Sequence, residues 1–327
     1  MTISRIACLW LLAVVLVYVN ALRVGKSQEF PLGSEIENLA VRPSGSILAV
    51  VYTFSRVYEV APVANAEPKL VHTFENTNGV SSIAKSPNSD EYFLITGNFS
   101  FQTLSPTPGS YAIHKLSFDK CDKSVVKQLA SLDAISQPNG MIAVPGTPYV
   151  LIADTREGFI YRFDTQTFQL GVYYDDPLLK PGTTSGVVFG VNGIKLSRGY
   201  LYFSNTNQQL VARVKASGNE DVLHGTPEIV ATQTPIDDLI VNKYNGDIYL
   251  AELSGNALGF VPRGANTTVP ETLLGGINST AILAPTSVVW AKGAEGRTLI
   301  VSETGGFEQF VTHNYTGGGR INIIHLD

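Results

Sequence analysis

Cysteine is scarce in this chain of 327 residues, which contains only Cys8 and Cys121. We expect Cys8 to be removed with an N-terminal targeting segment, so Cys121 has no partner for an internal disulfide bond. A chain of this size can bury enough apolar surface to be stable without disulfides. No histidine or aspartate forms a recognisable catalytic arrangement with Cys121, so we interpret this cysteine as structural or incidental.

Charge is also sparse: charged residues make up 16% of the chain and the net charge is −5. No run of lysine and arginine occurs, which argues against nucleic-acid partners and against electrostatic binding to a membrane. The chain has no G-x-S-x-G elbow, P-loop, dinucleotide fingerprint or H-E-x-x-H motif. Its five histidines lack the spacing of zinc ligands, so zinc is not favoured.

Long apolar runs are missing except near the N-terminus. Arg5 precedes an apolar stretch over residues 6–19, and Val19-Asn20-Ala21 offers compact residues before a cut after Ala21. This arrangement is typical of a secretory signal peptide, and the apolar run is short for a membrane span. We therefore expect residues 1–21 to be cleaved. The mature protein would be in the secretory pathway or extracellular, without stable membrane insertion; the alternative is an uncleaved anchor.

Four N-x-Ser/Thr sequons agree with that route, because they accept glycans only in the secretory lumen. They predict glycosylation at Asn98, Asn266, Asn278 and Asn314.

Helical periodicity is absent, and a different regularity takes its place. A polar residue is followed by a short β-branched run, a turn and a second apolar run, and this pattern occurs six times at intervals of roughly 50 residues. Each interval has room for four short strands. The sequence therefore predicts an all-β protein in which residues 22–327 form one domain, a six-bladed β-propeller with four-stranded blades and a central pocket. Two β-sandwiches are the rival architecture, but they would not explain six equivalent units.

The six repeats begin at polar residues. In a propeller the innermost strand of each blade lines the central channel, so the residues that open these strands converge at one mouth of it. We call them the ring: Glu37, Ser81, Asn139, Asn192, Asp237 and Thr286. The ring predicts a functional pocket, and the alternative is a polar throat filled with water. Taken singly, Asn139-Gly140 and Asn192-Gly193 would be interpreted as turns.

The ring offers two carboxylates and two carboxamides, which suit a hard cation such as Ca²⁺ or Mg²⁺. Asp237 and Asp238 are both candidates for a catalytic base. Adjacent strand residues point to opposite sides, so one of them would face the pocket and the other would pair outside it.

Aromatic residues in expected loops could form an apolar wall beside the ring. They are Tyr173, Tyr174, Phe189 and Phe307. The Pro-, Gly-, Thr- and Ser-rich segment 175–191 leads directly into Asn192, so we expect it to rim the pocket, where loops commonly determine selectivity.

Three motifs carry a family resemblance that covers nearly all of residues 22–327. They are Pro138-Asn139-Gly140, Val191-Asn192-Gly193-Ile194 with Leu201-Tyr202-Phe203-Ser204, and Ile236-Asp237-Asp238-Leu239. With them the chain resembles the senescence marker protein/gluconolactonase/luciferin-regenerating enzyme family of six-bladed propellers. The resemblance implies one divalent cation held by Glu37, Asn139, Asn192 and Asp237, with Asp237 as the base in lactone hydrolysis.

Residues 37–43 and Asp237-Asp238 further resemble a secreted fungal branch of these propellers. Some of its members resemble hetero-Diels–Alderases of tropolone–sesquiterpenoid biosynthesis, which join an o-quinone methide to a terpene alkene. That resemblance implies an enzyme acting on largely apolar small molecules, with Ser81, Asn139, Asn192, Thr286 and Phe189 in the substrate pocket. Cycloaddition requires no cofactor. The alternatives are a divalent-metal-dependent lactonase or esterase, and a non-catalytic propeller that binds a ligand or a protein.

Overall fold

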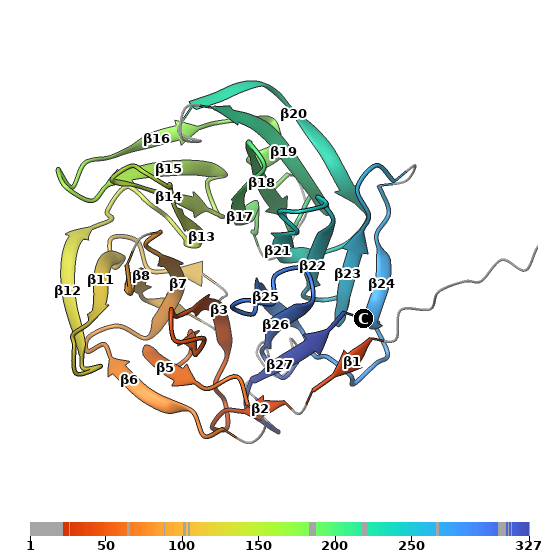
Figure 1. Ribbon diagram of the computed structural model, residues 1–327. Helices are drawn as coiled ribbons and strands as arrows, with labels where there is room; N and C mark the ends of the chain where they lie inside the picture. The colour runs from red at the N-terminus through yellow and green to blue at the C-terminus, as the bar shows by residue number, and fades with distance from the viewer. Residues whose placement is uncertain are drawn as a thin grey trace, which may run out of the picture.

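Strands follow one another along the chain as successive antiparallel hairpins. The computed structural model describes residues 22–25, 27–63, 66–87, 89–100, 103, 105–182, 188–217, 222–265, 268–306, 312, 314 and 316–326. In these residues six sheets are arranged radially around one axis, and each is a blade of a propeller (Figure 1). The predicted all-β, six-bladed fold is thereby confirmed.

The innermost strands surround the axis (Figure 1). They are β3 (Ile36–Val41), β7 (Gly79–Lys85), β13 (Pro138–Ala143), β17 (Val191–Ser197), β21 (Ile236–Val241) and β25 (Pro285–Trp290). The second strands are β4 (Ile47–Val51), β8 (Glu91–Gly97), β14 (Tyr149–Asp154), β18 (Tyr200–Asn205), β22 (Ile248–Glu252) and β26 (Thr298–Glu303). The third strands are β5 (Arg56–Val60), β11 (Ala112–Phe118), β15 (Phe159–Asp164), β19 (Leu210–Ser217), β23 (Ala257–Val261) and β27 (Arg320–His325).

The outer strands of the first five blades are β6 (Lys69–Thr73), β12 (Ser124–Ser131), β16 (Leu170–Tyr174), β20 (Val222–Thr232) and β24 (Glu271–Gly275). The sixth blade takes its outer edge from the other end of the chain: β1 (Arg23–Val24) and β2 (Gln28–Glu29) both pair antiparallel with β27. The first described residues and the last strand therefore close the circle together. The sequence pattern did not predict this contribution.

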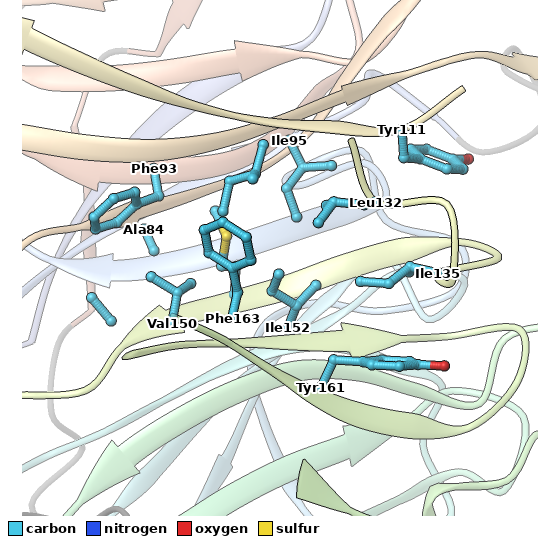
Figure 2. Close-up of a cluster of buried hydrophobic side chains, with 13 residues drawn as sticks. Ala84, Phe93, Ile95, Tyr111, Leu132, Ile135, Val150, Ile152, Tyr161 and Phe163 are labelled. Atoms are coloured by element: carbon cyan, nitrogen blue, oxygen red, sulfur yellow. The ribbon is translucent and has the colours of Figure 1, made fainter. Parts of the chain in front are cut away.

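The hydrophobic core is divided among the contacts between blades. In the described residues each pair of neighbouring blades shares one cluster of buried side chains. Figure 2 shows the cluster between the second and third blades, where Phe93 and Ile95 of β8 face Val150 and Ile152 of β14. Because a second strand is covered on both faces, its apolar residues need not alternate with polar ones. Strand β4 is an unbroken apolar run, and all five of its residues are buried.

Buried polar residues at the ends of second strands tie down the segments that lead into the inner strands. Asp154 accepts backbone N–H bonds from Ser136 and Gln137 at 2.7 and 3.1 Å, and from Arg156 and Glu157 at 3.2 Å each. Asn205 donates to the carbonyl oxygens of Leu178 and Lys180 in the fourth blade. Glu303 accepts the backbone N–H of Leu283 in the sixth blade. These contacts satisfy backbone groups that would otherwise be buried without partners.

Several sequence predictions concern residues away from the axis. Tyr173 and Tyr174, expected in a loop beside the pocket, instead lie on outer strand β16 and pack on the core between the third and fourth blades, so that expectation was wrong.

The glycosylation sequons lie away from the axis as well. Asn278 and Asn314 are exposed and Asn98 is half-buried. The signal segment 1–21, Asn266 and Phe307 lie outside the described residues. Glycosylation and secretion stay predictions. None of the described helices is long and apolar enough to cross a membrane.

The four hydrogen bonds to Asp154 lead to a prediction for stability. Asp154→Ala would leave buried N–H groups unpaired and should lower the free energy of unfolding by about 3 kcal/mol. The matched control is Asp164→Ala, because the Asp164 carboxylate accepts N–H bonds from Gln166 and Thr167 in an exposed turn. That control should lose less than about 1 kcal/mol. Urea unfolding measures both; equal losses would contradict the role assigned to Asp154.

Candidate active site

All six ring residues line one cavity at the axis of the propeller, each placed near the start of an inner strand. The cavity has a volume of about 50 Å³, and the atom-free space within it, open solvent included, amounts to about 580 Å³. Since one water molecule needs roughly 10–15 Å³ of cavity volume, the cavity holds only a few water molecules. A larger molecule must therefore extend from the ring toward the solvent-open mouth.

A repeated irregularity of the backbone turns the ring residues toward the axis. In each of the six inner strands the register with the second strand shifts beside the ring residue. Such β-bulges place an extra residue on one strand and redirect its side chains, and they are common beside active sites. The shifts occur between Ile36 and Leu39, Val80 and Ser82, Pro138 and Met141, Val191 and Ile194, Ile236 and Leu239, and Pro285 and Ser287.

The inner strands approach one another closely at the same level. Hydrogen bonds cross from blade to blade there: Thr286 Oγ1 to Ile36 O at 2.6 Å, Asn38 Nδ2 to Ser81 O at 3.1 Å, Ser204 Oγ to Asp237 O at 2.7 Å, and Ser82 Oγ to Asn139 O. At Gly140 and Gly193 there is no room for a side chain, because a Cβ would overlap the Asn192 carbonyl oxygen and the Asp238 carboxylate respectively. These Asn-Gly pairs therefore lie within strands, and close approach requires the glycines.

Asn192 holds one side of the ring. Its Nδ2 donates to Asp237 Oδ1 at 2.5 Å and to Thr206 Oγ1 at 3.0 Å. Thr206 donates its own proton to Ile236 O at 2.8 Å, so it can only accept from Asn192. This network fixes the orientation of the amide and leaves Asn192 Oδ1 buried without a hydrogen-bond partner. An orphaned carbonyl oxygen at a cavity indicates a place for a cation or a donor group.

The two ring carboxyls share a crowded environment. Burial, with a smaller effect of the Asp238 charge, raises the pKa of Glu37 to about 8, against a lowering effect of its hydrogen bond with Asn139. Burial also raises the pKa of Asp237 well above its ordinary value, helped by the charges of Glu37 and Asp238. No lysine, arginine or histidine is among the described residues that line the cavity. A proton or a bound cation must therefore compensate these carboxyls.

Asp238 does not line the cavity, although it was a candidate base. Its carboxylate receives hydrogen bonds from Lys195 Nζ at 2.6 Å and Ser287 Oγ at 2.9 Å. Asp237 and Asp238 thus point to opposite sides of β21, as alternation along a strand requires. Asp238 links three neighbouring inner strands, and of the two aspartates only Asp237 faces the cavity.

The wall of the cavity comes from loops on the same face as the ring. Phe189 comes from the segment before β17. Tyr52 and Leu253 directly follow second strands. Phe99 comes after Asn98, the residue that links it to β8, and it begins a small hairpin of β9 (Phe99–Ser100) and β10 (Ser105–Pro106). The six ring residues and Phe189 were predicted from the sequence, whereas the other lining residues were not; these are Glu35, Tyr52, Phe99, Gln137, Pro138, Leu253 and Thr304. A position just before an inner strand or just after a second strand is the signal that would have found them.

The ring fits a hard divalent cation. Glu37, Asn192 and Asp237 offer two carboxylates and an orphaned amide oxygen, and oxygen ligands of this kind are those that Ca²⁺ and Mg²⁺ prefer. Asn139 lies beside them and hydrogen-bonds Glu37. The described residues contain no cluster of three or more His, Cys, Asp or Glu side chains that could hold a metal, so the amide oxygens are essential to such a site.

The raised pKa of Glu37 predicts that the metal-stripped protein loses stability as the pH rises. In the unfolded chain Glu37 ionises near pH 4.5, whereas in the folded protein it keeps its proton up to about pH 8. The unfolded state therefore binds fewer protons in this window, and the free energy of unfolding declines across it.

Glu37→Gln should remove that contribution, so the difference between wild type and variant should vary between about pH 4.5 and 8 and level off above it. Urea unfolding at several pH values measures it. A difference that is constant with pH would contradict the assignment.

Comparison with known proteins gives similarity in both sequence and fold. No protein-family model matches the chain. A Phoma sp. protein named as an inferred hetero-Diels–Alderase is 22% identical over 296 residues, covering 83% of this chain and 84% of that protein. A Sarocladium schorii protein named in the same way is 26% identical over 225 residues, covering 61% of this chain and 55% of that protein.

Solved structures share the propeller. Regucalcin from Agrobacterium tumefaciens, described as a calcium-binding protein, has a TM-score of 0.62 at 14% identity, covering 93% of this chain and 95% of its own. A luciferin-regenerating enzyme has a TM-score of 0.64 at 12% identity with the same coverage. The PQQ-bound aldose sugar dehydrogenase of Streptomyces coelicolor has a TM-score of 0.60 at 14% identity, covering 94% and 99%. The chain thus resembles proteins named hetero-Diels–Alderase in sequence, and regucalcin and luciferin-regenerating enzyme in fold, as its motifs indicate.

Proposed function

We propose that the central cavity is an active site in which an o-quinone methide and an apolar alkene combine by hetero-Diels–Alder cycloaddition. The observation that carries the proposal is the division of the cavity into a polar end, formed by the ring, and a wall with Tyr52, Phe99, Phe189 and Leu253. The similarity to two proteins named for this reaction supports it.

The reaction needs positioning and hydrogen bonding. A C–C bond forms between the exocyclic methylene carbon and one alkene carbon, and a C–O bond forms between the carbonyl oxygen and the other. No atom leaves, and no net oxidation or reduction occurs. The carbonyl oxygen gains negative charge in the transition state as the ring becomes aromatic, so hydrogen-bond donors aimed at that oxygen accelerate the step.

Asn139 is the side chain best placed to donate. It lines the polar end and hydrogen-bonds Glu37, and its amide has a second N–H for a substrate oxygen. A divalent cation held by Glu37, Asn192 and Asp237 would, when bound, act as a Lewis acid toward the same oxygen. The carbonyl end of the substrate would lie against the ring, and the alkene would lie against the aromatic wall. That arrangement brings two reactants together and keeps water from the quinone methide.

The test is the cycloaddition itself. A quinone methide generated in situ with humulene should give faster reaction and a different product ratio and enantiomeric excess with the protein than without it. Asn139→Ala should slow the enzymatic reaction roughly a hundredfold to a thousandfold, since it removes one transition-state donor. Asn245→Ala, at an exposed turn, is the matched control. Unchanged product ratio and stereochemistry in the presence of wild-type protein would rule out the proposal.

A second candidate function is divalent-metal-dependent hydrolysis of a lactone or ester, and the orphaned Asn192 Oδ1 beside two uncompensated carboxyls favours it. In this function Asp237 would accept a proton from the attacking water. The tightly packed environment of Asp237 would hold it in place for that role.

Calcium should stabilise the protein if the ring binds it. At a free concentration one hundred times its Kd, Ca²⁺ would raise the free energy of unfolding by about 2.7 kcal/mol. Asp237→Asn should abolish both this gain and any lactone turnover, whereas Asp133→Asn, an exposed carboxylate, should retain them. Metal analysis and thermal unfolding before and after chelation provide the measurement. This function would be excluded if the wild-type protein contained no metal and its melting temperature changed neither with added calcium nor with chelator.

A further inference from the structure

A second recess lies between the fourth and fifth blades, on the face opposite the mouth of the central cavity. It has a volume of about 410 Å³ and is formed where the β17–β18 turn, the β21–β22 turn and the β23–β24 loop meet the outer strand β20. Arg198, Arg213 and Arg263 line it, together with Tyr200 and Tyr202. Glu228 is the one acidic side chain among its described lining residues, so the recess is positively charged.

Arg213 is neutralised and held in place. Its Nε and Nη2 donate to Glu228 Oε2 at 3.0 and 2.8 Å, and its guanidinium lies 4.6 Å from the centre of the Tyr200 ring. Glu228 therefore accounts for the charge of this arginine and is not available to the other two.

Arg198 and Arg263 converge with no carboxylate paired to either guanidinium group among the described residues; the nearby Asp247 Oδ1 accepts the backbone N–H of Arg263 at 2.9 Å, and its Oδ2 accepts from Asn245. A Cβ on Gly246 would lie 3.0 Å from Arg263 Cδ and 3.4 Å from Arg198 Nε, so both side chains cross over this one glycine. Arg198 Nη1 is anchored to the carbonyl oxygens of Lys243 and Tyr244 at 2.8 and 3.0 Å. In the described part of the chain neither arginine forms an ion pair with a carboxylate. Two like charges held together in a recess favour an anion between them.

We propose that this recess binds a small oxyanion with an apolar body, such as a phosphate monoester or an aromatic carboxylate. The oxyanion would lie between Arg198 and Arg263, whose planar guanidinium groups match such oxygens. The apolar body would lie on Tyr200 and the neighbouring Ile229, which is 40% exposed, and Val261 and Pro262 complete that side. The concave shape selects a small molecule over a flat anionic surface.

Isothermal titration at low salt with phenyl phosphate, benzoate, inorganic phosphate and phenol tests this site. Phenyl phosphate and benzoate should bind, inorganic phosphate should bind more weakly, and phenol should not bind. Binding should weaken as sodium chloride is added, because the attraction is screened. Failure of both aromatic anions to bind would overturn the proposal. Equal binding of phenol would do so as well, since it would leave no role for the arginines.

Variants locate the binding. Arg263→Gln should weaken phenyl phosphate about tenfold, corresponding to the loss of one charge-assisted contact. Arg162→Gln is the matched control, since Arg162 is exposed and stacks on Tyr149 in another blade. Asp237→Asn changes the central cavity and not this recess. It should therefore leave the affinity for phenyl phosphate unchanged. Unaltered affinity in Arg263→Gln, or an equal loss in either control, would refute the site.

Discussion

The close approach of six inner strands around one axis is the constraint on which the rest of the structure depends. At that level each strand contacts its neighbour through small side chains, glycines or a hydrogen-bonded carbonyl, and the bulges beside the ring turn polar side chains inward. Gly140 and Gly193 carry no side chain because the next strand occupies that space. The same packing that completes the circle therefore creates a cavity whose lining comes from six distant parts of the sequence.

That construction explains why the sequence predicted the fold and ring well. A blade covered on both faces gives unbroken apolar runs, and a polar residue ahead of each run is conspicuous against them. The outer parts were less predictable. Tyr173 and Tyr174 look like loop aromatics because an outer strand is short and half-exposed, and only its pairing with β15 identifies it. Strands β1 and β2 have two residues each, too few for any periodicity to appear.

The site could be predicted in part for the same reason. Strand alternation predicted that Asp237 and Asp238 would separate, but only the structure identifies Asp237 as the one facing the cavity. The partners of Asp238 come from two other blades, and no local pattern reports such contacts. Glu35, Tyr52 and Phe99 were missed because loop residues reach the cavity according to the shape of their turns, which residue type alone does not determine. The fold itself leaves the reaction open, since similar propellers carry different chemistries.

The pairing of β1 with β27 has a mechanical meaning. Arg23 lies opposite His325 and Val24 opposite Ile324, so the first and last described strands are joined by a short ladder, which the pairing of β2 with β27 extends. Pulling on both ends would load this ladder before any other part of the molecule, and once it opened the blades could peel away one after another. Strand β27 is synthesised after the other strands of the six blades, so β1 and β2 can pair with it only once the rest of the propeller has been made. Closure of the circle therefore comes after the synthesis of all six blades.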